Sequence, residues 1–281
     1  MKSRVLVLLS VACLAAHSID ALAAELRVTR TAAGVPTVVF NDDFETDTVG
    51  TDPAIGAGDI GGTWMTNDST EVVVSDGPSE PIAAFDQFLK VQNSVGAVVG
   101  IAQGRFGSTV SSGSLSAEFS AQLPASGTNH ALNMSYENSG GTSESWTIIG
   151  SLPWLTGEAG LADPGDIGPG EGALAFFNGS WNYATSGGST LVFPLGTWVD
   201  VAMDYDLDSG SLSFTINGHT SDNVVPYDLL GDGTPGGDAV GIYFRQVAGA
   251  NGTPPNLSYV GGVIGAPGTA ALPGVDRRQG P

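Results

Sequence analysis

The chain has 281 residues, of which 41% are hydrophobic and 14% charged, with 41 glycines and one cysteine. Nine basic residues are set against 29 acidic residues, which gives a net charge of -20. Such a surface repels nucleic acid and anionic lipid, which both need a basic patch, and the apolar content excludes a disordered chain.

The first 23 residues have the pattern of an export signal. Lys2 and Arg4 precede an apolar stretch, and Ala21-Leu22-Ala23 fits a small-x-small cleavage site. The stretch is too short for a good membrane span, which needs about 20 apolar residues. Cleavage removes Cys13 and moves the net charge to -21, so the mature chain has no disulfide. We therefore expect a secreted protein, extracellular or at the cell surface, with no transmembrane segment.

Short alternating or β-branched stretches follow one another along the rest of the chain, and they predict more than ten strands. These stretches are 27–31, 37–40, 71–75, 88–93, 97–102, 114–123, 130–136, 145–150, 172–177, 180–184, 190–193, the hairpin 196–218, 239–246 and 257–264. Residues 83–89 have the composition of one helical turn, and 151–171 are the longest irregular stretch. This pattern predicts an all-β fold, a two-sheet antiparallel jelly-roll sandwich.

The hairpin 196–218 carries the clearest pattern. A period of two places every second side chain on one face, so we expect a buried face and a face in water. Asn217-Gly218 supplies the positive φ angles of a tight turn into the next strand. The inward residues are Val199, Val201, Met203, Tyr205, Leu212, Phe214 and Ile216, and the outward acids are Asp200, Asp204 and Asp206.

This hairpin, which contains Gly196-Thr197-Trp198 and ends in Asn217-Gly218, resembles a hairpin of laminin-G-like and concanavalin A-like jelly rolls. The stretch Asp42-Asp43-Phe44-Glu45 resembles the opening of many exported bacterial jelly-roll proteins. The resemblance implies the concanavalin A-like lectin/glucanase fold. We expect a signal peptide at 1–23, a lead-in at 24–35, one jelly-roll domain at 36–264 and a flexible, disordered tail at 265–281.

The resemblance also brings polysaccharide hydrolases and lyases into consideration. Glucanases of this fold carry a Glu-x-Asp-x-x-Glu strand, which this sequence lacks. Alginate lyases of this fold use three motif strands, and Tyr243-Phe244-Arg245 echoes only one of them. We therefore predict no catalytic residues and a protein that is not an enzyme.

Acidic, glycine-rich loops offer the oxygen ligands that calcium prefers. We expect candidates at two places, namely Asp42, Asp43 and Glu45 before the first long loop, and Asp206 with Asp208 in the hairpin turn. Asp232 and Asp238 flank a third glycine-rich loop. We therefore expect a structural calcium ion, and the alternative is that these aspartates only form turns.

Aromatic side chains are the remaining signal, because sugar rings stack on flat aromatic surfaces. Trp154 lies in the irregular stretch 151–171, where we expect it to be exposed. Trp181 and Tyr183 are two residues apart, so they share one face of a strand. They are either a platform for a sugar ring or core residues. The tryptophans expected in the core are Trp64, Trp146 and Trp198.

The sequence as a whole favours a secreted, non-catalytic, lectin-like protein whose partner is a glycan or extracellular polysaccharide and which is a monomer. Two alternatives remain open at this point. One is a structural or adhesive extracellular protein with no sugar ligand, and the other is a hydrolase or lyase.

Overall fold

The structure is a computed structural model that describes residues 25–67, 72–75, 87–93, 100–125, 130–140, 143–222, 225–226, 237–246 and 256–262. The expected signal peptide, the tail at 265–281 and most of the helical turn at 83–89 lie outside these residues. No helix in the described part of the chain is long and apolar enough to cross a membrane.

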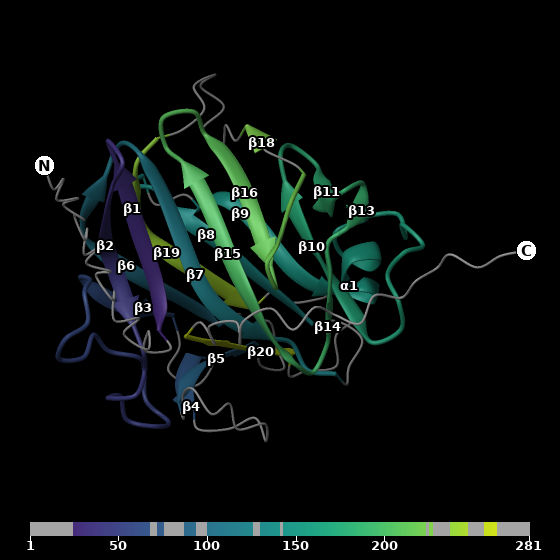
Figure 1. Ribbon diagram of the computed structural model, residues 1–281. Helices are drawn as coiled ribbons and strands as arrows, with labels where there is room; N and C mark the ends of the chain where they lie inside the picture. The colour runs from purple at the N-terminus through teal and green to yellow at the C-terminus, as the bar shows by residue number, and fades with distance from the viewer. Residues whose placement is uncertain are drawn as a thin grey trace, which may run out of the picture.

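Two antiparallel sheets form a sandwich, which confirms the predicted jelly-roll class (Figure 1). Sheet A contains β1 (Leu26–Ala32), β2 (Val35–Asp42), β4 (Val72–Ser75), β5 (Phe88–Asn93), β7 (Ser114–Gln122), β15 (Trp198–Asp206), β16 (Ser211–Ile216), β17 (His219–Thr220), β18 (Val225–Pro226) and β20 (Asn256–Gly261). Sheet B contains β3 (Thr63–Thr66), β6 (Ile101–Val110), β8 (Ala131–Glu137), β9 (Ser143–Ser151), β10 (Glu171–Phe177), β11 (Trp181–Tyr183), β14 (Val192–Pro194) and β19 (Ala239–Gln246). The small pair β12 (Thr185–Ser186) and β13 (Ser189–Thr190) and the helix α1 (Leu152–Gly157) complete the described elements.

The middle of sheet A is β7, which pairs with β15 along one edge and with β1 and then β20 along the other. Since β1 is a full member of this sheet, the described jelly roll begins at Leu26 and not at residue 36. The expectation that 24–35 is a lead-in before the domain is therefore wrong, because β1 pairs with both β2 and β7.

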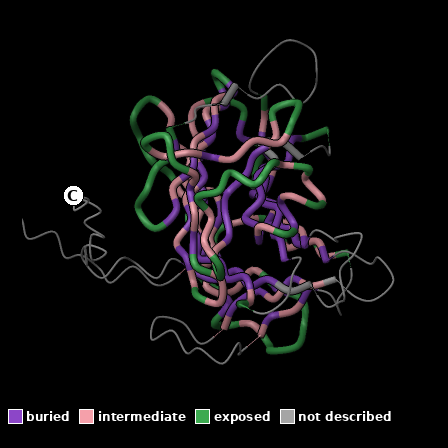
Figure 2. Tube along the Cα trace, turned by 90° about the vertical axis from the view of Figure 1, so that its right-hand side faces the viewer, coloured by how far each residue is buried: buried purple, intermediate pink, exposed green. Residues whose placement is uncertain are grey.

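The core lies between the two sheets, where buried residues gather in the edge-on view (Figure 2). Aromatic pairs join the sheets, with Tyr136 stacked on Tyr205 at 5.7 Å between ring centroids and Phe176 on Phe214 at 6.2 Å. The hydroxyl of Tyr136 also donates a hydrogen bond to the Met203 carbonyl at 2.9 Å. Sheet B therefore has one face sealed against sheet A and one outer face.

The predicted hairpin is confirmed in β15 and β16. All seven residues expected inward are buried, whereas Asp200, Asp204 and Asp206 alternate with them on the outer side and keep partial exposure. Asn217 and Gly218 have φ angles of 49° and 80°, as the predicted tight turn requires.

Strand β6 continues to Val110, well beyond the predicted stretch 97–102. Its glycines obscure the strand pattern, but Gly104 has a packing reason. A Cβ at Gly104 would lie 2.5 Å from the Phe40 ring, so the absence of a side chain allows that ring to pack on the strand.

Candidate functional site

Polar side chains occupy the outer face of sheet B on three of its strands, which are β8, β19 and β6. Along β8, Leu132, Met134 and Tyr136 enter the core, and alternation sends the residues between them outward. The same alternation applies to β19, where Ile242 and Phe244 are core residues. We call the outward set the polar grid; it consists of Ile101, Gln103, Arg105, Asn133, Ser135, Glu137, Gly241, Tyr243 and Arg245.

The pairing register arranges the polar grid in three rows across β6, β19 and β8. The rows are Arg105, Gly241 and Glu137; Gln103, Tyr243 and Ser135; and Ile101, Arg245 and Asn133. Strands lie about 4.8 Å apart and alternate residues about 6.5–7 Å apart, so the grid spans roughly 10 by 13 Å between Cα atoms.

An ion pair closes the first row. Nη2 of Arg105 lies 3.0 Å from Oε1 of Glu137, although strand β19 runs between their strands. Gly241 lies between them on β19, and a Cβ there would lie 2.8 Å from the Gly104 carbonyl oxygen, so a side chain at this position would disturb the pairing of β19 with β6. The guanidinium also donates to Oε1 of Gln103 at 3.4 Å.

Burial controls the acid–base behaviour of the polar grid. It raises the pKa of the Glu137 carboxyl, and the positive charge of Arg105 opposes this rise only in part. Burial also raises the pKa of the Tyr243 hydroxyl, which the neighbouring Arg245 guanidinium partly offsets through its charge and a hydrogen bond. Tyr243 is therefore a neutral hydroxyl at pH 7, able to donate or accept a hydrogen bond.

Several buried polar atoms of the grid have no hydrogen-bond partner among the described residues. They are Nε of Arg105, Nε of Arg245, Oγ of Ser135 and Oε2 of Glu137. Buried polar groups are normally paired, and leaving one unpaired costs about 1–3 kcal/mol. Their concentration on one face of sheet B, where Ser135, Glu137 and Tyr243 are themselves buried, is typical of a site that receives a polar ligand.

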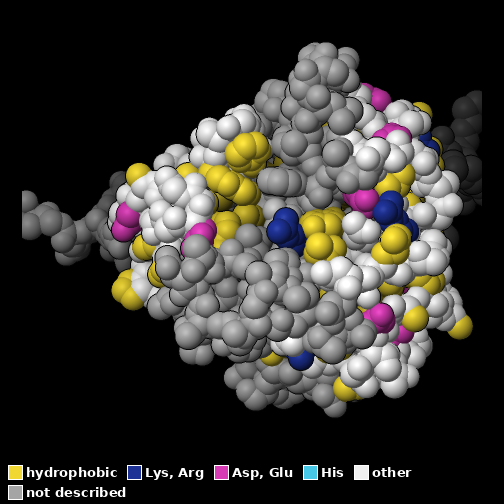
Figure 3. All heavy atoms as spheres, turned by 180° about the vertical axis from the view of Figure 1, so that it is seen from behind, with side chains coloured by type: hydrophobic (Ala, Val, Ile, Leu, Met, Phe, Trp, Pro, Cys, Tyr) yellow, Lys and Arg dark blue, Asp and Glu magenta, His cyan; other side chains and the backbone are white. Residues whose placement is uncertain are grey.

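Figure 3 shows the molecule from behind, where Lys and Arg side chains lie near the middle of the surface beside hydrophobic ones. Sheet B lies behind sheet A in Figure 1, so this is the side of the outer face. Sequence reasoning missed the polar grid as a site. The one available signal was Tyr243-Phe244-Arg245, whose alternation sends Tyr243 and Arg245 to the same face.

The three aromatic residues expected to bind sugar lie in a second apolar cluster on the same outer face, beside the polar grid. We call it the α1 cluster; it includes Ala131, Ile148, Trp154, Leu155, Ala173, Ala175, Trp181 and Tyr183. The expectation that Trp154 is exposed is wrong, since its side chain is 3% exposed within helix α1. Ser151 precedes the helix, Pro153 occupies its first turn, and the helix packs Trp154 and Leu155 against β9 and β10.

Trp181 and Tyr183 share one face of β11, as their spacing predicts, and both are partly exposed. The Trp181 ring packs edge-on against Trp154 at 6.5 Å and against Phe177 at 5.5 Å. They therefore cover the rim of the α1 cluster, and their exposed parts remain available to a ligand. Of the tryptophans expected in the core, Trp64 packs against it and Trp198 is partly exposed, whereas the Trp146 side chain lies outside the described part.

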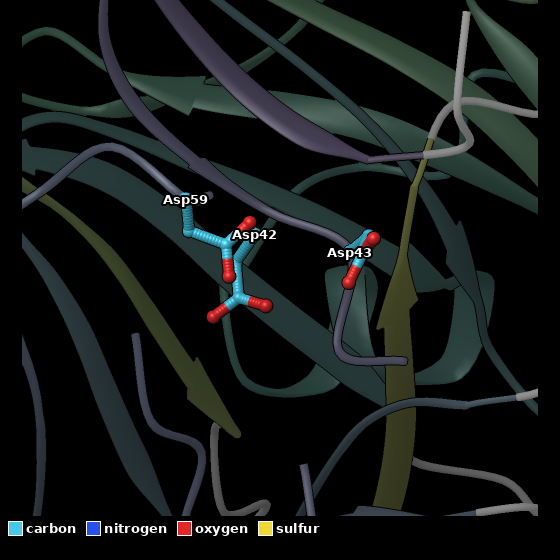
Figure 4. Close-up of side chains that lie close together, drawn as sticks. All are labelled: Asp42, Asp43 and Asp59. Atoms are coloured by element: carbon cyan, nitrogen blue, oxygen red, sulfur yellow. The ribbon is translucent and has the colours of Figure 1, made fainter. Parts of the chain in front are cut away.

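Three aspartates come together where β2 ends. One carboxylate oxygen each from Asp42, Asp43 and Asp59 lies within 4.8 Å of the others (Figure 4). Asp59 was not among the expected ligands. Glu45 is not in the group; its carboxylate accepts the Gln87 backbone N–H at 3.0 Å. Three carboxylates within this distance fit a calcium ion by ligand type.

Asp42 is the buried member of this group. Its oxygens accept hydrogen bonds from the Phe44 backbone N–H at 2.7 Å and from Nε1 of Trp64 at 2.5 Å. Burial nevertheless raises the pKa of Asp42 to about 7, and the charges of Asp47 and Asp59 add to the rise. A bound cation would act in the opposite direction by favouring the ionised carboxylate.

The other acidic loops hold turns in place. The Asp206 carboxylate accepts from the Asp208 backbone N–H at 2.9 Å and from Oγ of Ser209 at 2.8 Å, and Asp208 accepts from Gly113 at 3.2 Å. Among the described residues, Asp206 and Asp208 join no group of three possible ligands. Asp238 accepts the Ser139 N–H at 3.0 Å, and Asp232 lies outside the described part.

Neither a family model nor a curated protein matches the sequence. Among solved structures, the catalytic domain of a glycoside hydrolase family 131 protein from Coprinopsis cinerea is 17% identical with a TM-score of 0.47, covering 80% of this chain and 92% of that one. A carbohydrate-binding module from Bacillus subtilis is 7% identical with a TM-score of 0.38, covering 71% of this chain and 92% of the module. A sialidase is 10% identical with a TM-score of 0.44; the match covers 69% of this chain but spans only 16% of the sialidase. At these identities and TM-scores the function has to be argued from the residues of sheet B.

Proposed function

We propose that this chain is a secreted, non-catalytic carbohydrate-binding protein whose glycan lies on the polar grid. The observation that carries the proposal is the set of buried, unpartnered polar atoms of Arg105, Ser135, Glu137 and Arg245, as counted among the described residues. Sugar hydroxyls are both donors and acceptors, so they pair equally well with guanidinium, hydroxyl and carboxylate groups.

Aromatic residues beyond the polar grid, on the same sheet, also support an extended glycan. The partly exposed rings of Trp181 and Tyr183 lie on β11, at the far edge of the same sheet. Strand β11 is three strands away from β8, which corresponds to about 14 Å. A ligand that reaches both regions is a polysaccharide and not a single sugar.

Binding is favoured over hydrolysis by the distribution of carboxylates. Glycosidases need two carboxyl groups about 5–9.5 Å apart on either side of the scissile bond. On the described outward side chains of β6, β8 and β19, Glu137 is the only carboxylate, and its Oε1 is bound to Arg105. This arrangement supports recognition without bond cleavage.

The test is a glycan-binding screen of the mature protein, followed by titration of the best ligand with Tyr243→Phe. Loss of one hydrogen bond of about 0.5–1.5 kcal/mol weakens binding roughly 2–10-fold. Thr215→Ala, on strand β16 of the opposite sheet, is the matched control and should leave affinity unchanged.

Three results would change the proposal. Absence of glycan binding would favour the structural or adhesive alternative, and new reducing ends or unsaturated products would favour a hydrolase or lyase. Equal losses of glycan affinity in Tyr243→Phe and Thr215→Ala would show that the ligand does not bind at the polar grid.

A further inference from the structure

The polar grid has a charge opposite to that of the whole molecule. The chain carries nine Lys and Arg residues against 29 acidic ones, yet the described outward side chains of β6, β8 and β19 contain two arginines and one carboxylate. A small positive area within such an acidic surface selects the part of a ligand that carries negative charge.

The two arginines of the grid are not equivalent. Arg105 is paired with Glu137, so its charge is already balanced. Arg245 forms no ion pair with any described carboxylate, and the other charged side chains of the grid, Arg105 and Glu137, lie two rows away from it. The excess positive charge of the face is therefore located at Arg245.

The guanidinium of Arg245 also has a free donor. Its Nε is buried and has no hydrogen-bond partner among the described residues, while the guanidinium interacts with the Tyr243 hydroxyl. Nε–H and an adjacent Nη–H point in parallel, and this edge matches the two oxygens of a planar carboxylate. Neighbouring hydroxyl and amide groups come from Tyr243 and Asn133, which occupy adjoining grid positions.

We propose that Arg245, assisted by Tyr243, binds the carboxylate of an acidic sugar, so that the ligand is a uronate-containing polysaccharide. This inference rests on the proposed carbohydrate-binding function and adds the chemical class of the glycan. Arg105 and Glu137, whose charges balance each other, are positioned to bind the uncharged hydroxyls of the same chain. A sulfate group also presents two oxygens to a guanidinium edge, so the experiment compares a sulfated polymer with a carboxylated one.

The experiment compares the affinity of the mature protein for three polymers at 0.15 M salt, namely a polyuronate, a sulfated dextran and a neutral β-glucan. Titrations are repeated with Arg245→Ala, Arg245→Lys and the matched control Arg30→Ala, whose side chain contacts Ser112 near β1 of sheet A. Melting temperatures of all variants confirm that each is folded.

The wild-type protein should bind the polyuronate in preference to the other two polymers. Arg245→Ala should weaken polyuronate binding at least tenfold, and Arg245→Lys should give an intermediate loss because it keeps the charge but not the planar edge. Arg30→Ala should bind like the wild type.

The outcomes separate this inference from the proposed function. Binding of only the neutral glucan would overturn the acidic-sugar inference and leave carbohydrate binding intact, whereas binding of none of the polymers would overturn both. Preference for sulfated dextran, or equal losses in Arg245→Ala and Arg30→Ala, would overturn the carboxylate subsite. Cleavage of the polyuronate with a continued need for Arg245 would overturn only the non-catalytic part of the proposed function.

Discussion

Asp42 is a carboxylic acid held away from water at the end of β2. Its side chain is 1% exposed, and burial raises its pKa from 3.8 to about 7. Between these two values the folded state retains a proton that the unfolded state has lost. The free energy of unfolding therefore falls as the pH rises through this window, by about 4 kcal/mol in total as an order of magnitude.

The first prediction concerns this pH dependence. Asp42→Asn cannot ionise, so its free energy of unfolding should vary less between pH 4 and pH 7 than that of the wild type. Urea denaturation across this range measures the difference. Asp206→Asn is the control, because hydrogen bonds from Ser209 and Asp208 lower the pKa of Asp206, which stays ionised over most of the window. Parallel profiles of wild type and Asp42→Asn would show that Asp42 ionises normally.

The second prediction concerns calcium at Asp42, Asp43 and Asp59, where three carboxylates meet. Calcium at 100 times its dissociation constant adds about 2.7 kcal/mol to the free energy of unfolding. The gain should be larger at pH 8 than at pH 5, because a protonated Asp42 is a poor ligand. Thermal denaturation with calcium and with chelator measures it. Asp59→Asn should abolish the gain and Asp206→Asn should keep it. Equal melting temperatures with and without calcium would show that the folded protein does not bind the ion at this site.

At the scale of elements, the hairpin of β15 and β16 was predictable because alternation and a turn dipeptide agree over a long stretch. Helix α1 was not, since its six residues are shorter than two helical turns and carry no readable period. Its position is set by tertiary packing of Trp154 and Leu155 on sheet B. The strand β6 was only partly predicted, because Gly104 and Gly107 interrupt its pattern.

The third prediction tests the packing of the hairpin. Phe214 is fully buried and stacks on Phe176 of the opposite sheet. Phe214→Ala should lower the free energy of unfolding by about 3–5 kcal/mol, because it removes apolar contacts and leaves a cavity. Urea denaturation gives the value, with Thr215→Ala on the outer side as the control that should change little. A loss below about 1 kcal/mol for Phe214→Ala would contradict the assigned register.

The fourth prediction replaces the sequence-based view of Trp154. Because the indole lies inside the α1 cluster, Trp154→Ala should destabilise the protein by about 3–5 kcal/mol instead of acting mainly on ligand binding. Melting temperature and glycan affinity measured on the same variant distinguish these effects. An unchanged melting temperature together with lost affinity would restore the exposed role.

At the scale of the whole molecule, the sandwich class followed from the number and spacing of the strands, but the polar grid did not. The grid combines β6, β8 and β19, which are distant in the sequence and become neighbours only through the sheet order. Gln103 and Arg105 were not distinguished as site residues because nothing local reveals that they oppose Tyr243 and Gly241. Asp59 was missed as a possible calcium ligand for the same reason, since only the folded chain brings it close to Asp42 and Asp43.

The fifth prediction is the most direct test of the account, and it observes the arginine side chains themselves. In a ¹H–¹⁵N spectrum, each arginine Nε–H gives its own signal, which shifts when the group gains a hydrogen-bond partner. On titration with an oligouronate, the signals of Arg105 and Arg245 should shift together and saturably, while those of Arg27 and Arg30 on β1 should stay in place. Shifts confined to Arg27 and Arg30, or no shift at Arg245 at saturating ligand, would contradict an acidic glycan on the outer face of sheet B.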